Sequence, residues 1–140
     1  MARKILYKNI DQDIRSLVKT LNESGIVKTY ASCAGHGSDT AAEIIFKPVD
    51  ISRWALLKEK LLQLSDQLPD ANINIYEWHR IGGIDWVLEV QAHPRNRQSL
   101  EFEGSKVREV LNRTFKMIEK VFEKRGDPLP RTSRGKDYLL

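Results

Sequence analysis

The spacing of apolar residues constrains this fold more than any other feature, because it divides the chain into helical stretches and paired β-like stretches. Apolar residues recur at helical spacing in three stretches: residues 11–23, the segment between Asp50 and Pro69, and the segment that starts at Ser105. Short segments with β-like patterns lie between them: residues 26–31, 42–47, 72–78 and 84–92. Residues 4–8 add a further short strand. The order βαββαββα predicts a single two-layer α+β domain, in which helices cover one face of a mostly antiparallel sheet.

Local signals support these elements. Capping or stop residues flank all three helices: Asn9 or Asp11 and Gly25 for the first, Asp50 or Ser52 and Pro69 for the second, and Ser105, Gly126 and Pro128 for the third. The third helix carries the clearest apolar stripe: Val107, Val110, Leu111, Thr114, Met117, Ile118, Val121 and Phe122. In the strands, alternation puts these apolar residues on one face: Ile44 and Phe46, then Ile84, Trp86, Leu88 and Val90. Residues 80–83 supply a hairpin turn.

Length and composition indicate one soluble domain over residues 1–126, followed by a flexible basic tail over residues 127–140. A single cysteine cannot form an intrachain disulfide, and neither a signal peptide nor an apolar run of membrane-spanning length is present. We therefore expect a cytoplasmic protein that does not enter a membrane. The formal net charge of +4 is too small to identify nucleic-acid binding by itself.

The most informative candidate site is the run from Ser32 to Gly37, which contains Cys33 and His36. Gly35 and Gly37 allow the backbone to bend sharply and to direct its N–H groups at a ligand. The same glycines also suit a turn that simply requires positive φ angles. The run therefore predicts a binding loop, with an ordinary turn as the alternative.

Chain direction predicts which residues share an end of the domain with this loop. Each helix and strand is long enough to cross the domain once, so direction alternates along the chain. The following residues then share one end: Cys33, His36, His93, Arg95 and Arg97. The first and third helices begin at the same end, and Ser105 lies at the start of the third. Unpaired N–H groups at helix starts favour phosphate. His79 lies at the opposite end, so the three histidines cannot form one site.

Cys33 and His36 allow three chemical roles. With His93 as a third ligand they form a zinc site with an open position, although no matching second pair is present. Alternatively, Cys33 is a nucleophilic thiol activated by the helix starts, by Arg95 and by His36. A buried structural cysteine is the third possibility. We therefore assign Cys33 and His36 as candidate catalytic residues and assign no metal ligands.

Two further surfaces are candidates for binding. One is a cationic stripe along the last helix, formed by Arg113, Lys116, Lys120 and Lys124. Such a stripe suits a phosphate backbone as well as a solvated surface. The other is a sheet face bearing Tyr76 and Trp78, or Trp86, which is typical of a homodimer interface.

One stretch of the chain also resembles a known family signature. The stretch from Leu21-Asn22 through Thr29-Tyr30-Ala31-Ser32-Cys33-Ala34-Gly35-His36 resembles the N-terminal signature of the methyltransferase family of tRNA wybutosine synthesis. That family carries a leucine-asparagine pair and then a strand end running into Ser-Cys-Ser-Gly, and it commonly has arginine at the position of His36. The resemblance implies Ser32, Cys33 and Gly35 as binding-site residues, and S-adenosylmethionine and tRNA as ligands.

Together these features predict binding of a phosphate-bearing ligand, either a nucleotide or RNA. The candidate ligand-binding residues are Ser32, Gly35, Gly37, His93, Arg95, Arg97 and Ser105. The alternatives are a metal-dependent or thiol-dependent hydrolase, a relative of the methyltransferases, and a structural protein that forms homodimers.

Overall fold

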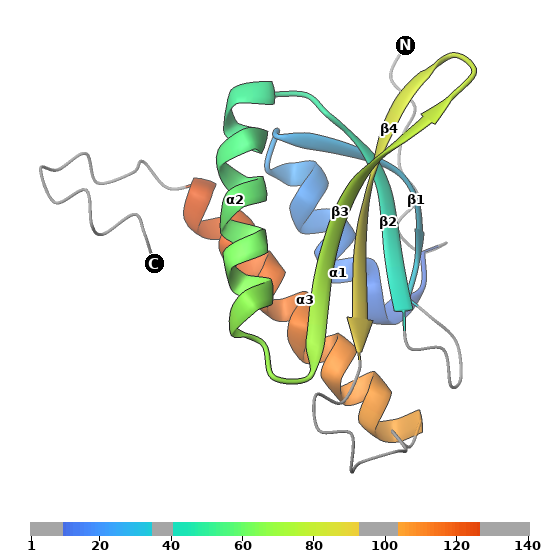
Figure 1. The fold of residues 1–140 in the computed structure, drawn as a ribbon, viewed down its shortest axis with the longest axis vertical. Helices are drawn as coiled ribbons and strands as arrows, with labels where there is room; N and C mark the ends of the chain where they lie inside the picture. Colours follow the sequence, from blue (N-terminus) through green and yellow to red (C-terminus); the bar gives the residue numbers. More distant parts are fainter. Residues whose placement is uncertain (1–9, 35–40, 93–103, 127–140) are drawn as a thin grey trace, which may run out of the picture.

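The computed structural model describes residues 10–34, 41–92 and 104–126, with the side chains of the last helix described over residues 106–123. Helices and strands follow in the order αββαββα (Figure 1). Their bounds are α1 (Gln12–Glu23), β1 (Val27–Cys33), β2 (Ala41–Pro48), α2 (Ile51–Gln67), β3 (Ala71–Arg80), β4 (Gly83–Ala92) and α3 (Gly104–Gly126). The predicted strand over residues 4–8 and the predicted tail over residues 127–140 lie outside the described residues.

The strands form one antiparallel sheet with the order β1-β2-β4-β3. Ile44 in β2 lies opposite Leu88 in β4, which in turn lies opposite Ile75 in β3. The helices lie together on one face of the sheet, against this row (Figure 1). The prediction of an α+β fold with an antiparallel sheet is confirmed.

The core fills the space between the helices and this face of the sheet. Its fully buried large side chains come from all three helices and from alternate strand positions: Ile14, Leu17, Leu21, Ile26, Ile44, Phe46, Leu57, Leu61, Leu88, Leu111, Phe115 and Phe122. The ring of Trp54 packs edge-on against Phe46, with centroids 4.8 Å apart, and against Trp86 at 5.7 Å. Burial of each such side chain contributes about 1.5–3 kcal/mol, so the predicted apolar stripes are what holds the helices on the sheet.

The stripe on α3 differs from the prediction at two positions. Phe115 is buried although the sequence analysis omitted it, and Met117 is 37% exposed although it was placed on the stripe. Phe115 lies four residues after Leu111, so both occupy the buried face of the helix. Thr114 is also buried, and its hydroxyl donates to the carbonyl oxygen of Val110 at 2.8 Å.

No described helix is both long enough and apolar enough to span a bilayer.

The helix ends agree with most of the predicted caps. Asp50 precedes α2 and its carboxylate accepts from the N–H of Arg53 at 3.1 Å. Gly25 follows α1 with φ of +75°, a conformation that glycine adopts without strain. The cap predicted at Ser105 is wrong, because α3 already begins at Gly104. Ser105 instead lies in the first turn, where backbone N–H groups also lack partners within the helix.

β1 is longer than predicted, so Ser32 and Cys33 belong to the strand and not to the loop. The pairing with β2 continues through both residues, with Ser32 opposite Ile44 and Cys33 opposite Glu43. A strand ends where its backbone pairing with the neighbouring strand ends, and residue type alone does not determine where that pairing stops.

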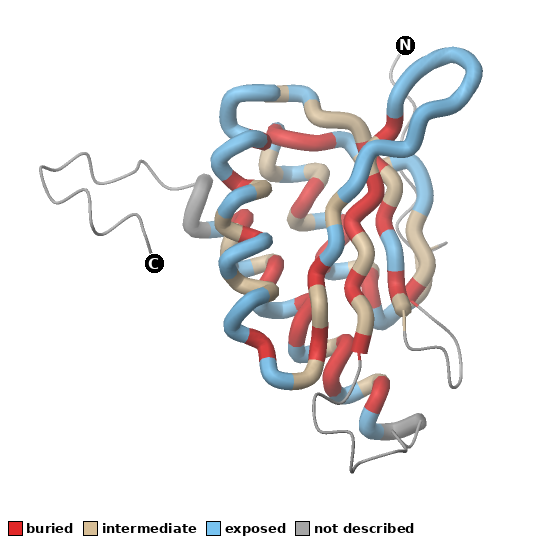
Figure 2. The backbone as a smooth tube through the Cα atoms, viewed as in Figure 1, coloured by how far each residue is buried: buried red, intermediate tan, exposed pale blue. Residues whose placement is uncertain are grey.

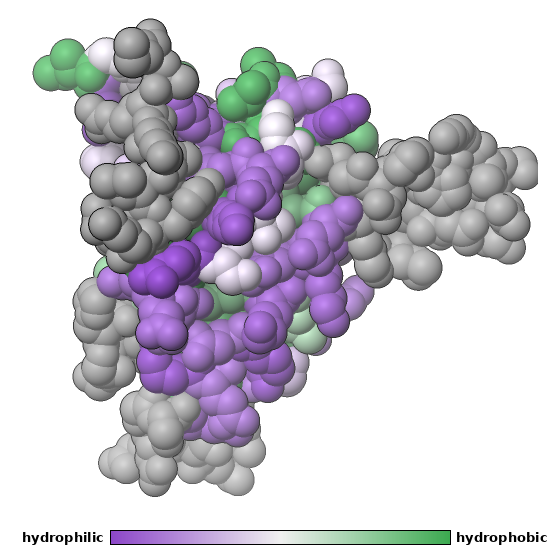
Figure 3. All heavy atoms as spheres, turned by 180° about the vertical axis from the view of Figure 1, so that it is seen from behind, coloured by the Kyte–Doolittle hydropathy of each residue, from purple (hydrophilic) through white to green (hydrophobic). Residues whose placement is uncertain are grey.

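The β3–β4 hairpin extends past the helices (Figures 1 and 2). Arg80 pairs with Gly83, so the turn consists of Ile81 and Gly82 and is tighter than the predicted four residues. Ile84 lies on the same face as Trp86, as predicted, but it is 45% exposed because no helix covers this part of the sheet. Ile81 is fully exposed in the turn. The described surface seen from behind is mainly hydrophilic (Figure 3).

A buried carboxylate lies at the base of this hairpin. Asp85 in β4 is only 1% exposed, and it lies 3.2 Å from the ammonium of Lys47 and 2.8 Å from the guanidinium of Arg80. A buried charge is tolerated when opposite charges surround it. The sequence analysis did not predict this ion-pair cluster, which joins β2, β3 and β4.

Candidate functional site

The candidate site lies at the end of the sheet where β1 and β4 finish. Cys33, the last residue of β1, lies opposite Glu43 in β2, and Glu43 lies opposite Glu89 in β4. Ala41, where β2 begins, lies opposite Gln91 near the end of β4. We call this end of the domain, where the chain leaves the sheet after Ala34 and after Ala92, the loop end.

The starts of α1 and α3 meet the chain at the loop end. The N–H of Ala34 donates to the carboxylate of Asp11, the residue before α1, at 3.1 Å. The carbonyl oxygen of Ala34 accepts from the guanidinium of Arg108 in the second turn of α3, at 2.6 Å. Arg108 also pairs with Asp13 in the first turn of α1 at 3.0 Å. Both backbone groups of Ala34 are therefore held, and the start of the candidate loop has a fixed position.

Sequence reasoning missed the role of this cluster of Asp11, Asp13 and Arg108. Asp11 was predicted as a helix cap, but its side chain makes no cap hydrogen bond and binds Ala34 instead. Arg108 is separated from Asp13 by 95 residues and from Ala34 by 74. No local pattern reports contacts over such separations, so only the assembled fold brings these residues together.

The cluster also changes the electrostatics expected at the loop end. Asp11 and Asp13 place negative charge at the start of α1, where the helix dipole already favours an anion. The positive end of this helix dipole therefore already has the protein's own carboxylates beside it. Both helix starts also carry cations: the guanidinium of Arg15 donates to the carbonyl oxygen of Ile10 just before α1, at 3.0 Å, and Lys106 and Arg108 lie in the first turns of α3.

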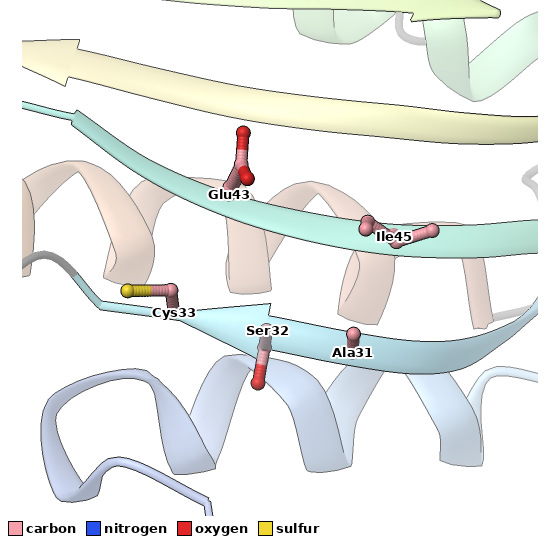
Figure 4. Close-up of a pocket in the computed structure, with 5 residues that line it drawn as sticks. All are labelled: Ala31, Ser32, Cys33, Glu43 and Ile45. Atoms are coloured by element: carbon pink, nitrogen blue, oxygen red, sulfur yellow. The ribbon is translucent and has the colours of Figure 1, made fainter. Parts of the chain in front are cut away.

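Cys33 lies in a shallow hollow on the face of the sheet opposite the helices (Figure 4). The hollow has a volume of about 110 Å³ and is lined by Ala31, Ser32, Cys33, Glu43 and Ile45. Cys33 and Glu43 project to this open face, whereas the side chain of Ser32 projects toward α1 (Figure 4). This follows from the alternation of side chains along a strand. The hydroxyl of Ser32 and the thiol of Cys33 therefore do not face a ligand from the same side.

The environment of Cys33 bears on its predicted chemical roles. Its thiol is half-buried and not enclosed in the core. The titratable side chain directly across from it is the carboxylate of Glu43, whereas nucleophilic thiols have positively charged neighbours. Within the described ranges, no group of three or more His, Cys, Asp or Glu side chains is arranged to hold a metal ion.

A row of polar residues crosses the open face beside the hollow. Glu43 and Glu89 lie directly opposite each other, and the amide of Asn74 donates to Glu89 at 3.0 Å. Tyr76 lies one row further from the loop end. Partial desolvation, together with the charges of Glu43 and Glu89, raises the pKa of Tyr76 above its ordinary value. The part of the open face next to Cys33 is thus acidic.

The predicted site residues divide into two groups. Ser32 and Cys33 lie in β1 at the loop end, and the backbone of Ser105 lies in the first turn of α3. The remaining candidates lie outside the described residues: Gly35, His36, Gly37, His93, Arg95 and Arg97. Their described neighbours Ala34 and Ala92 both leave the sheet at the loop end. His79, predicted at the opposite end, is next to the hairpin turn and pairs with Ile84.

The cationic stripe of α3 forms a separate surface. Lys116 and Lys120 are exposed, and Arg113 is exposed but forms an ion pair with Asp70. The side chain of Lys124 lies outside the described part of the helix. One of the predicted cations is thus already neutralised by the protein.

Comparisons with protein-family models, with curated proteins and with solved structures gave no match. The resemblance to the wybutosine-synthesis methyltransferases therefore stays a prediction. Any function must be argued from the chain itself.

Proposed function

We propose that this protein is a binding domain that holds a phosphate-bearing ligand, a nucleotide or a stretch of RNA, at the loop end. One observation carries the proposal: β1 and β4 finish at the same end of the sheet, through the pairs Cys33–Glu43 and Ala41–Gln91. The segments that follow them, residues 35–40 and 93–103, contain the two glycines, His36, His93 and the arginine pair.

Phosphate recognition in this proposal relies on backbone N–H groups and on guanidinium groups. Arg95 and Arg97 bind phosphate oxygens bidentately, and the glycines let backbone N–H groups of the loop approach the same oxygens. The start of α3 adds further N–H groups. The fixed position of Ala34 supports the proposal, since a loop with an anchored start loses less conformational freedom when it binds.

The open face beside Cys33 has the wrong charge for phosphate. Glu43 and Glu89 repel an anion, and Asp11 and Asp13 occupy the start of α1. The ligand in this proposal therefore approaches from the end of the sheet and from the α3 side, with its phosphates away from the acidic row.

The test compares two double variants by fluorescence anisotropy with a short fluorescein-labelled single-stranded RNA and with a labelled ATP analogue. Arg95→Ala/Arg97→Ala should abolish binding. The matched control, Lys116→Ala/Lys120→Ala, removes the same charge from the exposed stripe of α3 and should leave affinity within about twofold.

Salt dependence gives a second check. For RNA, the slope of log affinity against log salt should fall by about 0.7 in each single variant, Arg95→Ala or Arg97→Ala, because each contact to a single-strand phosphate contributes about 0.7. Unchanged affinity of the arginine variant would refute the proposal. Loss of binding in the lysine variant alone would place the nucleic acid along α3 and would also refute it.

A further inference from the structure

The outer edge of β3 is open over half of its length. β3 lies at one edge of the sheet, beside β4. The N–H of Ile73 points outward, because it donates to the hydroxyl of Ser65 in α2 at 2.8 Å. N–H groups of alternate residues point to the same side of a strand, so those of Ile75, Glu77 and His79 also point outward. In the described structure no strand pairs with them.

The other edge strand of the sheet, β1, is protected against pairing with a further strand, unlike β3. In β1 the pairing register shifts between Thr29 and Ala31, and such an irregularity disfavours pairing with a further strand. The N–H of Thr29 donates to the side chain of Asn22 at 2.9 Å, and the Asn22 amide donates to the Thr29 hydroxyl. β3 carries no such irregularity in its pairing with β4, which runs without a break from Ala71 to Arg80.

The open half of β3 is also accessible. The residues from Tyr76 to Arg80 are exposed, and this half of the strand extends past the helices (Figures 1 and 2). Tyr76 is 45% exposed and Trp78 is 43% exposed, on the open face. Another strand can therefore approach the edge without meeting α2.

The sequence of this edge is complementary to itself when the second strand runs antiparallel. If Trp78 lies opposite Trp78 of a second copy, Glu77 lies opposite His79 and Tyr76 lies opposite Arg80, on both sides of the twofold axis. Glu77 and His79 then form hydrogen-bonded pairs, as their outward N–H groups require. An acid therefore meets a base on both sides of the axis, which is a favourable cross-strand pair.

Neighbouring registers lack this complementarity. Centring the pair on Glu77 places the two Glu77 carboxylates directly opposite each other, and centring it on His79 places the two imidazoles opposite each other. The two carboxylates repel each other, and the register centred on His79 leaves Glu77 opposite Ile81 and not opposite a base. Recentring on Glu77 or His79 moves one strand by two residues relative to the other. A relative shift of one residue is excluded by strand geometry, because it would pair outward N–H groups with inward ones.

We propose that two copies of the chain pair through β3 in this register, which joins their sheets into one continuous antiparallel sheet. The interface is short, so the dimer depends on protein concentration. Because β3 starts at the loop end and reaches the interface with its other half, the two loop ends lie far apart in the dimer. The pairing therefore does not depend on the proposed ligand site.

The experiment measures the dissociation constant of the dimer by sedimentation velocity, with circular dichroism to confirm folding of each variant. The wild-type chain should form dimers as its concentration rises. Glu77→Pro should be monomeric, because it removes an outward N–H with which none of the four described strands pairs. His79→Glu should weaken the dimer about tenfold or more, since each of its two copies then faces Glu77. The matched variant His79→Lys should retain or strengthen it.

A charge exchange tests the register itself. Glu77→Lys/His79→Glu restores opposite charges across the interface and should recover the dimer that His79→Glu weakens. A wild-type chain that stays monomeric up to its solubility limit would overturn the proposal. So would a dimer that neither Glu77→Pro nor His79→Glu weakens, since a different surface must then form it. Arg95→Ala/Arg97→Ala should leave dimerisation unchanged, which separates this test from that of ligand binding.

Discussion

Replacement of Arg108 by methionine is the sharpest stability test of the loop end. The Arg108 guanidinium joins the carbonyl oxygen of Ala34, at 2.6 Å, to the carboxylate of Asp13, at 3.0 Å. Methionine keeps an unbranched side chain of similar reach, so the variant removes the charge and the donors while keeping most of the packing.

The expected loss follows from the two interactions. A hydrogen bond that involves a charged group contributes about 1.5–3 kcal/mol, and Arg108 is only 24% exposed, so the bond to Ala34 belongs in this range. The pair with Asp13, whose side chain is 44% exposed, adds less than about 1 kcal/mol. The Nε of Arg108 is buried without a hydrogen-bond partner among the described residues, and its removal recovers part of the loss. We expect Arg108→Met to lower the free energy of unfolding by about 2–3 kcal/mol.

Urea unfolding followed by tryptophan fluorescence measures this loss. The control, Asp13→Asn, removes only the exposed ion pair and should cost less than about 1 kcal/mol. Hydrogen exchange at the Ala34 amide should also become faster in Arg108→Met, because the segment that presents this amide to Asp11 is then held on one side only. Equal losses in the two variants, or an unchanged exchange rate, would refute the idea that Arg108 fixes the start of the loop.

Three further predictions follow from the fold. Asp85→Asn should lower the free energy of unfolding by about 1–2 kcal/mol in urea, because Lys47 and Arg80 lose their shared carboxylate but are exposed enough to turn toward water. Gly25→Ala should cost about 1 kcal/mol in the same assay, because φ is +75° at this position. For Tyr76 the folded-state pKa is raised, so the unfolded chain loses its proton first and stability should fall as pH rises above about 10. Unfolding at pH 8 and pH 11 measures this loss, which Tyr76→Phe should reduce.

Each of these predictions has a matched comparison. Asp66→Asn changes an exposed carboxylate on α2 and should stay within about 0.5 kcal/mol of the wild type, so an equal effect of Asp85→Asn would contradict the role of the buried cluster. Gly25→Asn should cost less than Gly25→Ala, because asparagine tolerates positive φ better. If Tyr76→Phe loses as much stability at high pH as the wild type, other groups cause the loss.

Much of the fold was predictable because its signals are local. The stripe that includes Ile14, Leu17 and Leu21 has helical period, and the alternation of Ile44 and Phe46 has the period of a strand, so each pattern defines its element and its buried face. On α3 the predicted stripe was wrong at Phe115 and Met117, which are two residues apart and therefore lie on nearly opposite faces of the helix.

What could not be predicted depends on contacts between distant segments. Ser32 and Cys33 belong to β1 because Ile44 and Glu43 pair with them, and nothing in their own residue types indicates this. The burial of Asp85 depends on cations from two neighbouring strands. The order β1-β2-β4-β3 likewise reflects which strands pack together and not the sequence of any one of them.

The meeting of the ends of β1 and β4 was predictable from the sequence, but the charges beside Cys33 were not. Alternation of chain direction was enough to bring the ends of β1 and β4 to one end of the domain, as the pair Ala41–Gln91 shows. It did not reveal that Glu43 and Glu89 would face each other beside Cys33, because that depends on the register between β2 and β4.

The central claim is that a phosphate-bearing ligand binds at the loop end, and a titration of ¹⁵N-labelled protein with a short single-stranded RNA or with ATP, followed by NMR, tests it most directly. The account predicts that backbone shifts concentrate at Cys33, Ala34, Ala92 and the first turns of α3. Shifts confined to the hairpin around Ile81 or to the exposed lysines of α3, or no shifts with either ligand, would contradict it.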